Sequence, residues 1–375
     1  MPQVDRQYPE GANGWRLRAG AVIDRASGVP VKRLRSGFAG HAGTAGAATV
    51  LLVVGVTMGL VVSLCAGLSG AGASANKGSG GPPRWSAPTK VPGVKGLFAV
   101  SCPTARFCVA VGHDDAVSYA KGHWSAPIPL GTDGTINGGL TAVSCTSTEF
   151  CMAGSGAGDT FTFDGTSWSA LGTLSPTGLS QISCATPTFC GALDINGASY
   201  FYNGSQWSSA VTIPAASQSQ WISCPVHGTC VAVDGTATDV NRYDNGKWSA
   251  LGTIAPSTPT GGSEPDEPSA ISCAGTRFCA ALDNFGEAFT WHGGRWSGPT
   301  RFDANLLDGV DAVSCASPTS CMLVDDDGIA AAWNGSSWSK GSQIDGAPGS
   351  LTDVSCATAT SCMAVDARGR AIRYG

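Results

Sequence analysis

The stretch 311–339 reads DAVSCASPTSCMLVDDDGIAAAWNGSSWS, and its pattern decides the fold. An alternating segment ends at Ser314-Cys315, and five residues separate it from Cys321, which opens a largely apolar segment. Turn-forming Asp-Gly and Asn-Gly pairs then set off a third segment and the closing Trp338-Ser339 pair. Short runs bounded by such turns predict four consecutive antiparallel strands.

The same unit occurs seven times, with 39 to 49 residues between successive first cysteines. This period matches the blade of a β-propeller, about 40 to 50 residues. Every copy contains a Ser-Cys-x5-Cys motif. The seven cysteine pairs are Cys102 and Cys108, Cys145 and Cys151, Cys184 and Cys190, Cys224 and Cys230, Cys273 and Cys279, Cys315 and Cys321, and Cys356 and Cys362.

The seventh copy ends at Tyr374-Gly375, before its Trp-Ser pair, whereas an unmatched Trp85-Ser86 stands ahead of the first copy. A closed ring needs this arrangement, because one blade is then completed from both ends of the chain. We therefore expect an all-β fold, a seven-bladed β-propeller over residues 83–375 that is closed by an N-terminal outer strand. An open β-solenoid is the alternative, and it predicts atypical capping repeats instead of a split unit.

The segments ahead of the repeats differ from them in composition. Residues 1–46 carry a net charge of +4, against −9 for the remainder, and are expected to form a disordered cytoplasmic tail. Residues 47–68 contain no charged residue, and a helix of that length, about 33 Å, spans the hydrocarbon core. We expect a single transmembrane helix there, and a Gly/Pro linker over residues 69–82.

The orientation of this segment follows from the basic residues before it. They place the N-terminus in the cytoplasm and the propeller outside the membrane, by the positive-inside rule. The alternative is a signal peptide cleaved near Ala75, after the small residues of Ala73-Ser74-Ala75, which gives a secreted protein.

The paired cysteines are expected to form seven disulfides, each linking the first and second strands of one blade. The sequence has no C-x2-C motif and no histidine that recurs with the repeat, so we expect no metal site and no cofactor. Paired cysteines in an extracytoplasmic domain are normally oxidised.

The candidate ligand-binding residues are those that depart from the repeat or bear charge at its turns. Trp221 stands where other copies have a smaller residue before Ser-Cys, whereas the recurring Trp-Ser tryptophans are expected to pack between blades or to serve as platforms for sugar rings. Four copies carry an Asp-x-x-Gly turn, which either only forms the turn or adds to an acidic rim for calcium or a cationic ligand. The predicted ligand-binding residues are Trp221, Asp283, Asp325, Asp326, Asp327 and Asp366.

The connection 257–269 is the longest between repeats and contains Glu264, Asp266 and Glu267. It is expected to lie on the same face as the Asp turns. It is either a loop that determines ligand specificity or a tolerated insertion.

Function is narrowed mainly by what the sequence lacks. No G-x-S-x-G, H-E-x-x-H or phosphate-binding loop motif is present, and an acidic propeller is a poor partner for nucleic acid. We expect a non-catalytic binding or scaffold protein at the cell surface, whose partner is a cell-wall glycan or an extracytoplasmic protein. The alternative is an extracellular hydrolase or lyase, since a pair of catalytic carboxylates needs no local motif.

Residues 83–375 also resemble a known group of proteins in the Ser-Cys-x5-Cys and Trp-Ser elements. The group comprises uncharacterised, secreted or membrane-anchored β-propeller repeat proteins of high-GC actinobacteria. The resemblance implies the propeller fold and an extracytoplasmic location, and it implies no catalytic residues.

Overall fold

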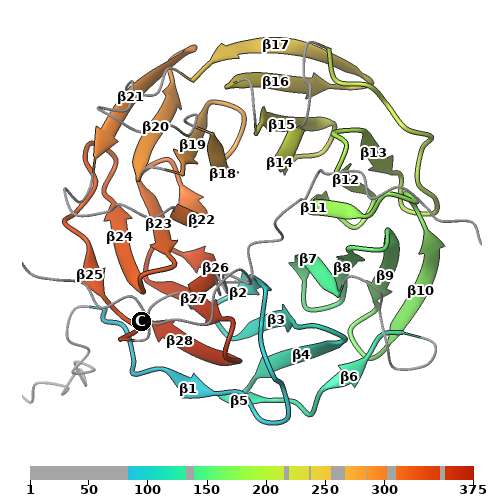
Figure 1. Cartoon of the computed structure of the whole chain (residues 1–375), viewed down its shortest axis with the longest axis vertical. Helices are drawn as coiled ribbons and strands as arrows, with labels where there is room; N and C mark the ends of the chain where they lie inside the picture. Colours follow the sequence, from blue (N-terminus) through green and yellow to red (C-terminus); the bar gives the residue numbers. More distant parts are fainter. Residues whose placement is uncertain are drawn as a thin grey trace, which may run out of the picture. The chain divides into compact units, whose positions relative to one another are not determined.

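The computed structural model describes residues 83–375, except for 132–138, 215–218, 236–237, 255–266, 285, 302–309 and 347–350. These residues form seven antiparallel sheets arranged as blades around a central axis (Figure 1). No helix long and apolar enough to cross a membrane occurs in this part of the chain. The tail, transmembrane helix and linker predicted at 1–46, 47–68 and 69–82 lie outside the described residues.

Blades 1 to 4 follow one another along the chain, and the first strand of each is the innermost. Blade 1 is β2 (Ala99–Thr104), β3 (Phe107–Val111), β4 (Asp115–Ala120), β5 (His123–Trp124) and β6 (Ile128–Pro129). Blade 2 is β7 (Leu140–Ser147), β8 (Phe150–Ser155), β9 (Asp159–Phe163) and β10 (Trp168–Thr173). Blade 3 is β11 (Leu179–Thr186), β12 (Phe189–Asp194) and β13 (Ser199–Tyr202), and blade 4 is β14 (Ser219–Val226), β15 (Thr229–Asp234), β16 (Asp239–Asp244) and β17 (Lys247–Thr253).

Blades 5 and 6 repeat this order, and blade 7 takes its outer strand from the N-terminal side. Blade 5 is β18 (Pro268–Cys273), β19 (Phe278–Asp283), β20 (Glu287–His292) and β21 (Arg295–Arg301). Blade 6 is β22 (Val310–Ser317), β23 (Ser320–Asp325), β24 (Ile329–Trp333) and β25 (Ser342–Gln343). Blade 7 is β26 (Leu351–Thr358), β27 (Ser361–Asp366), β28 (Arg370–Tyr374) and β1 (Thr89–Lys90).

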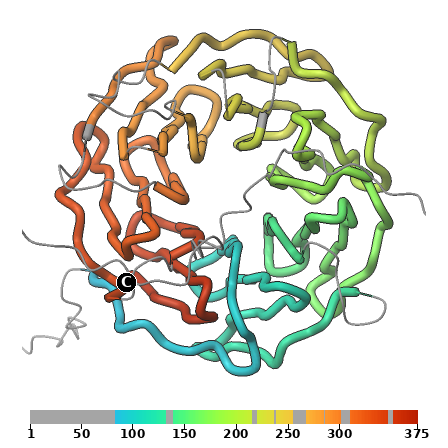
Figure 2. Tube along the Cα trace, viewed as in Figure 1, coloured from blue at the N-terminus to red at the C-terminus, as the bar shows by residue number. Residues whose placement is uncertain are grey.

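The ring closes within blade 7, as the split repeat predicts. Thr89 and Lys90 of β1 pair with Ala371 and Arg370 of β28, so the N-terminal segment lies beside the C-terminal strands (Figure 2). The amide of Ser86 also donates to the carbonyl of Arg373 (2.7 Å). This closure confirms the propeller and excludes the open solenoid.

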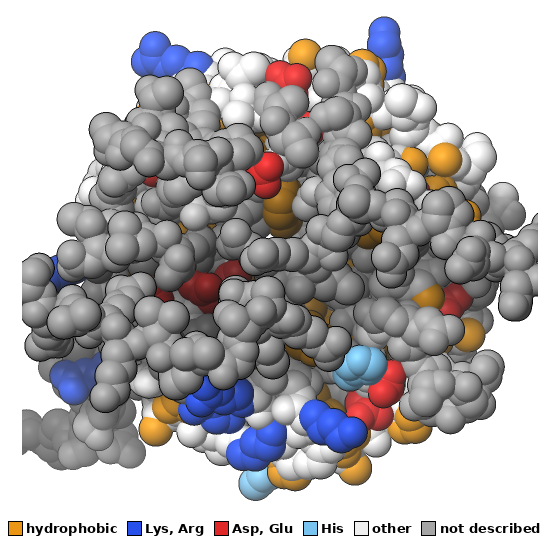
Figure 3. Space-filling view, viewed as in Figure 1, with side chains coloured by type: hydrophobic (Ala, Val, Ile, Leu, Met, Phe, Trp, Pro, Cys, Tyr) orange, Lys and Arg blue, Asp and Glu red, His pale blue; other side chains and the backbone are white. Residues whose placement is uncertain are grey.

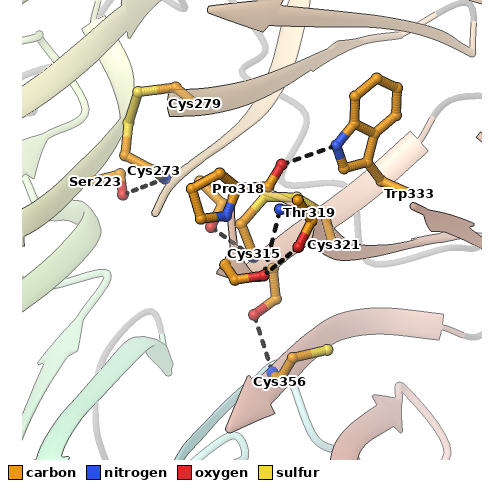
Figure 4. The surroundings of a disulfide bond; sticks show 12 residues. Ser223, Cys273, Cys279, Cys315, Pro318, Thr319, Cys321, Trp333 and Cys356 are labelled. Atoms are coloured by element: carbon orange, nitrogen blue, oxygen red, sulfur yellow. Dashed lines mark hydrogen bonds between the residues drawn. A yellow bond between two sulfur atoms is a disulfide. The ribbon is translucent and has the colours of Figure 1, made fainter. Parts of the chain in front are cut away.

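Neighbouring blades are joined by a hydrogen bond that repeats around the whole ring. The serine before each first cysteine accepts, through Oγ, the backbone N–H of the first cysteine in the next blade, at 2.8–3.0 Å (Figure 4). The last bond joins Ser355 of blade 7 to Cys102 of blade 1. The acceptors are Ser101, Ser144, Ser183, Ser223, Ser272, Ser314 and Ser355.

All seven predicted disulfides form, each between the innermost strand and the second strand of one blade. The two cysteines face each other across the strand pair, with Cα atoms 3.9–4.0 Å apart. In five of the seven pairs they are direct partners in the register of the sheet: Cys145–Cys151, Cys184–Cys190, Cys273–Cys279, Cys315–Cys321 and Cys356–Cys362. The C-x5-C spacing is therefore the length of one short hairpin.

The Trp-Ser tryptophans pack at the outer part of the blade interfaces. Each lies 5.2–5.7 Å, centroid to centroid, from an aromatic ring on the third strand of its own blade, as Trp248 does from Tyr243. Trp338 also joins the apolar cluster that contains Ala288 of blade 5, and Trp124 joins the cluster with Ala371 of blade 7. Small residues on the third strand leave room for the indole of the next blade.

The fourth strand is more irregular than the sequence suggests. In blade 6 the pair Trp338-Ser339 does not open a continuous strand, because only Trp338 bridges to Trp333 and β25 begins at Ser342. The Oγ of Ser339 accepts the N–H of Ala332 (3.0 Å) and so replaces a backbone carbonyl at the interruption. Ser86, Ser125 and Ser208 accept an N–H of the third strand in the same way.

Reduction of the disulfides is expected to lower the melting temperature substantially. Each bond closes a loop of about seven residues, which corresponds to about 2 kcal/mol by the chain-entropy estimate. The measurement is a thermal melt of the full chain with and without a phosphine reductant, with free thiols counted in parallel. An unchanged melt with all fourteen thiols free would contradict a stabilising role.

Ser355→Ala is expected to lower the free energy of unfolding by about 1–3 kcal/mol, because the buried amide of Cys102 loses its acceptor. Ser183→Ala, which removes the same bond between blades 3 and 4, should cost a similar amount. Ser209→Ala is the matched control, since Ser209 is exposed. Urea unfolding of the three variants provides the comparison, and equal stabilities would show that the serine ring contributes nothing.

Candidate functional site

One face of the ring carries the connections that differ between blades, and we name it the loop face. It consists of the turns between second and third strands and of the connections from one blade to the next. The two kinds of connection meet at Glu267 and Asn284. The N–H of Glu267 donates to Oδ1 of Asn284, and the N–H of Asn284 donates to the carbonyl of Glu267, both at 2.9 Å. The segment from Trp168 to Cys184 is the shortest between blades, and that from Trp248 to Cys273 is the longest.

The opposite face is far more regular, because it carries the C-x5-C hairpins, whose length is the same in all seven blades. Length variation is therefore concentrated on the loop face. This is the arrangement of a rigid scaffold that presents variable segments.

Five aspartates end second strands at the loop face, and all of them are buried, with at most 3% of their surface exposed. In four of them Oδ1 accepts the N–H of the residue four positions later, at 2.7–2.9 Å. Ser155 does the same in blade 2 through its hydroxyl (3.0 Å). These side chains hold the turns in place. The five aspartates are Asp194, Asp234, Asp283, Asp325 and Asp366.

The second carboxylate oxygen of these aspartates has different partners in different blades. In blade 3, Asp194 accepts hydrogen bonds from the hydroxyl groups of Ser175 (2.9 Å) and Tyr200 (3.1 Å). In blade 7, Asp366 accepts a hydrogen bond from Nε of Arg370 (2.5 Å), and the same guanidinium donates a second hydrogen bond to Asp345 (2.6 Å). Arg370 therefore ties the connection between blades 6 and 7 to the turn of blade 7.

Asp325 of blade 6 has the same turn but a different electrostatic environment. Its Oδ2 is buried and has no hydrogen-bond partner among the described residues. Burial raises the pKa of Asp325 to about 7, and the charges of Asp327 and Asp326 contribute to the rise, although the hydrogen bond from Ile329 opposes it.

Trp221 lies on the innermost strand β14 and is half-buried. It packs against the apolar cluster between blades 4 and 5, which contains Ile271 and Phe289. The backbone at Gly235 lies under its ring, so that a Cβ there would be 3.0 Å from the indole. The position of Trp221 is thus explained by packing, and its role in ligand binding stays a prediction.

The predicted ligand-binding residues are not gathered in one cluster. Asp325, Asp326 and Asp327 share the turn of blade 6, whereas Asp283 belongs to blade 5, Asp366 to blade 7 and Trp221 to blade 4. Among the residues that the structure describes, no group of three His, Cys, Asp or Glu side chains could hold a metal ion.

Two polar residues of the inner strands were missed by the sequence analysis. Gln181 and Asp353 stand three positions before the first cysteine, where four other blades have alanine. Their side chains accept backbone N–H groups of the next blade, from Ile222 (2.6 Å) and Val100 (2.7 Å). Burial raises the pKa of Asp353 to about 7 despite its two backbone hydrogen bonds. A polar residue in a column of alanines was the available signal.

Two cavities among the described residues lie between neighbouring blades, beside their outer strands. One of about 400 Å³ is bounded by Trp85, Tyr374 and Ala330, between blades 6 and 7. Another of about 310 Å³ lies between blades 2 and 3, beside Trp207 and Leu171. Neither is lined by a cluster of titratable groups.

Similar solved structures share this architecture. A structure of YCF48 bound to D1 peptide is 15% identical, with a TM-score of 0.61 over 79% of this chain and 96% of that one. YCF48 from Cyanidioschyzon merolae is 15% identical, with a TM-score of 0.56 over 77% and 98% of the two chains. The WD40 β-propeller domain of Doa1 is 10% identical, with a TM-score of 0.61 over 78% and 97%.

These identities establish likeness of fold alone. No protein-family model and no curated protein matches the sequence.

Asp325→Asn is expected to remove a pH-dependent loss of stability. The folded protein retains the Asp325 proton up to about pH 7, whereas the unfolded chain releases it near pH 4, so this group destabilises the fold as pH rises between these values. The variant should be more stable than the parent by a few kcal/mol at pH 8, at about 1.4 kcal/mol per pKa unit, and by less at pH 5.

Urea unfolding at pH 5 and pH 8 measures the difference. Asp239→Asn, which removes one negative charge from blade 4, is the control. The same stability difference for Asp325→Asn at both pH values would contradict the raised pKa.

Proposed function

We propose that this protein is an extracytoplasmic binding module, non-catalytic, which recognises a protein partner through the loop face. The observation that carries the proposal is the concentration of variable connections on one face of an otherwise repeated ring. A partner meets connections of different lengths there, whereas the C-x5-C hairpins of the opposite face all have the same length.

The rigidity of the ring supports binding by preformed loops. Every blade is crosslinked by a disulfide and joined to the next blade by the serine hydrogen bond. A partner that binds such a surface pays little conformational entropy on the side of the propeller. Four of the five buried aspartates of the loop face hold their own turns through Oδ1, which is a structural role.

The proposed location rests on the chemistry of the chain. Seven disulfides are typical of oxidising compartments, and the uncharged segment 47–68 after a basic tail is typical of an N-terminal anchor. We propose a single-pass membrane protein whose propeller lies outside the cytoplasm, with secretion after cleavage near Ala75 as the alternative.

A protein is favoured over a glycan because the loop face offers charged and hydrogen-bonding groups spread over several blades. The recurring tryptophans, which could stack on sugar rings, are instead engaged in packing between blades. One of the similar propellers was solved with a peptide bound, which supports a peptide or protein as the partner.

The test is binding of the full chain, kept soluble with detergent, to parallel arrays of peptides and of cell-wall glycans. We expect saturable binding to a subset of peptides. Asp327→Lys on the loop face should change the affinity for these peptides at least threefold, whereas Glu149→Lys on a C-x5-C hairpin should not. Binding to glycans alone, or equal effects of the two variants, would contradict the proposal.

A further inference from the structure

Charge is divided between the two blades at the ring closure and the other five. Blades 7 and 1, residues 83–131 and 351–375, contain eight Lys or Arg and four Asp, a net charge of +4. Residues 132–350, which contain the other blades, have six Lys or Arg and twenty Asp or Glu, a net charge of −14. A protein that is acidic overall therefore has one basic sector.

Part of this positive charge stands on the loop face, where the closing segment meets the turn of blade 7. The amides of Val91 and Leu97 donate to the carbonyls of Gly369 (2.9 Å) and Asp366 (3.0 Å), which fixes the segment against the turn. Lys95 and Arg368, both exposed, lie on these two adjoining pieces of chain. Figure 3 shows several Lys and Arg side chains close together at the bottom of the view, with others at the left and upper edges.

Lys95 and Arg368 differ from the other cations nearby because their charged groups are free to contact a ligand. Arg370 is held by Asp345 and Asp366, and Nζ of Lys90 donates to the carbonyl of Arg368 (2.5 Å). Within the described part of the chain, neither Lys95 nor Arg368 forms an ion pair. Burial and the charge of Asp114 raise the pKa of Asp115, and the charge of Lys95 opposes this rise.

The turn of the neighbouring blade has the opposite sign. Asp325 and Asp366 begin the equivalent turns of blades 6 and 7, and blade 6 continues with Asp326 and Asp327 where blade 7 has Ala367 and Arg368. An acidic ligand is therefore attracted to blades 7 and 1 and repelled by blade 6, which restricts where it can lie.

We propose that the closing segment and the blade 7 turn, through Lys95 and Arg368, form a docking surface for an acidic polypeptide segment. The proposal rests on the proposed function, because it names the class of protein segment that the loop face binds. Exposed charges of this kind act mainly on the rate and orientation of encounter, so binding should weaken strongly as salt increases.

The experiment measures binding of a fluorescent glutamate-rich peptide to the full chain by anisotropy, at low salt and at 0.5 M NaCl. We expect Lys95→Glu with Arg368→Glu to weaken binding at least tenfold. Arg106→Glu with Arg373→Glu is the matched control, since it reverses two exposed cations of the same sector away from the loop face. The control should weaken binding less than threefold.

Other outcomes assign the failure. Equal losses in the two double variants would overturn the proposal, because only net charge would then matter. Peptide binders on the array without binding of the acidic probe would overturn it and leave the proposed function intact, whereas an array without any peptide binder would overturn both. If the loop-face variant instead loses binding to vesicles of anionic lipid, and the acidic peptide does not bind, the surface is a membrane contact and the proposal is wrong.

Discussion

The hydrogen bond from each cysteine amide to the serine of the preceding blade is the interaction on which the ring depends. The innermost strand of a blade is an edge strand, so some of its N–H groups have no partner within their own sheet, and a buried N–H without an acceptor is costly. The serine hydroxyl provides that acceptor once per blade. The cysteine that follows this serine forms the disulfide to the second strand of its own blade. Two neighbouring residues thus connect the blade to the next one and crosslink it internally.

The sequence was sufficient for the architecture because the deciding contacts are local or periodic. The C-x5-C spacing implies a hairpin whichever neighbours surround it, and the third segment expected between the Asp-Gly and Asn-Gly turns is the strand β24, Ile329–Trp333. The role of Ser314 could not be read in the same way, since its partner Cys356 lies in the next blade. The interruption after Trp338 also escaped prediction, because it depends on whether a serine side chain or a backbone carbonyl accepts the N–H of Ala332.

The candidate site shows where sequence reasoning ends. Asp325 and Asp366 occupy equivalent positions in the turns of blades 6 and 7. Asp366 accepts a hydrogen bond from Arg370, whereas Oδ2 of Asp325 is buried without a hydrogen-bond partner among the described residues. Burial and neighbouring side chains determine this difference, and neither can be read from the sequence of one repeat. The basic sector is similar: the individual charges are visible in the sequence, but only the closure of residues 89–90 on 370–371 unites those of both chain ends.

The contrast between local disulfides and a distant closure has a consequence for how the chain folds. Each disulfide joins residues six positions apart, so correct pairing can be reached in any blade as soon as its own hairpin forms, without waiting for the rest of the chain. The pairing of β1 with β28 joins residues from opposite ends of the domain and belongs to the slow, non-local steps. Disulfide formation can therefore proceed blade by blade from either direction. The pairing of the N-terminal strand β1 is expected to form last, and the outer edge of blade 7 stays unpaired until then.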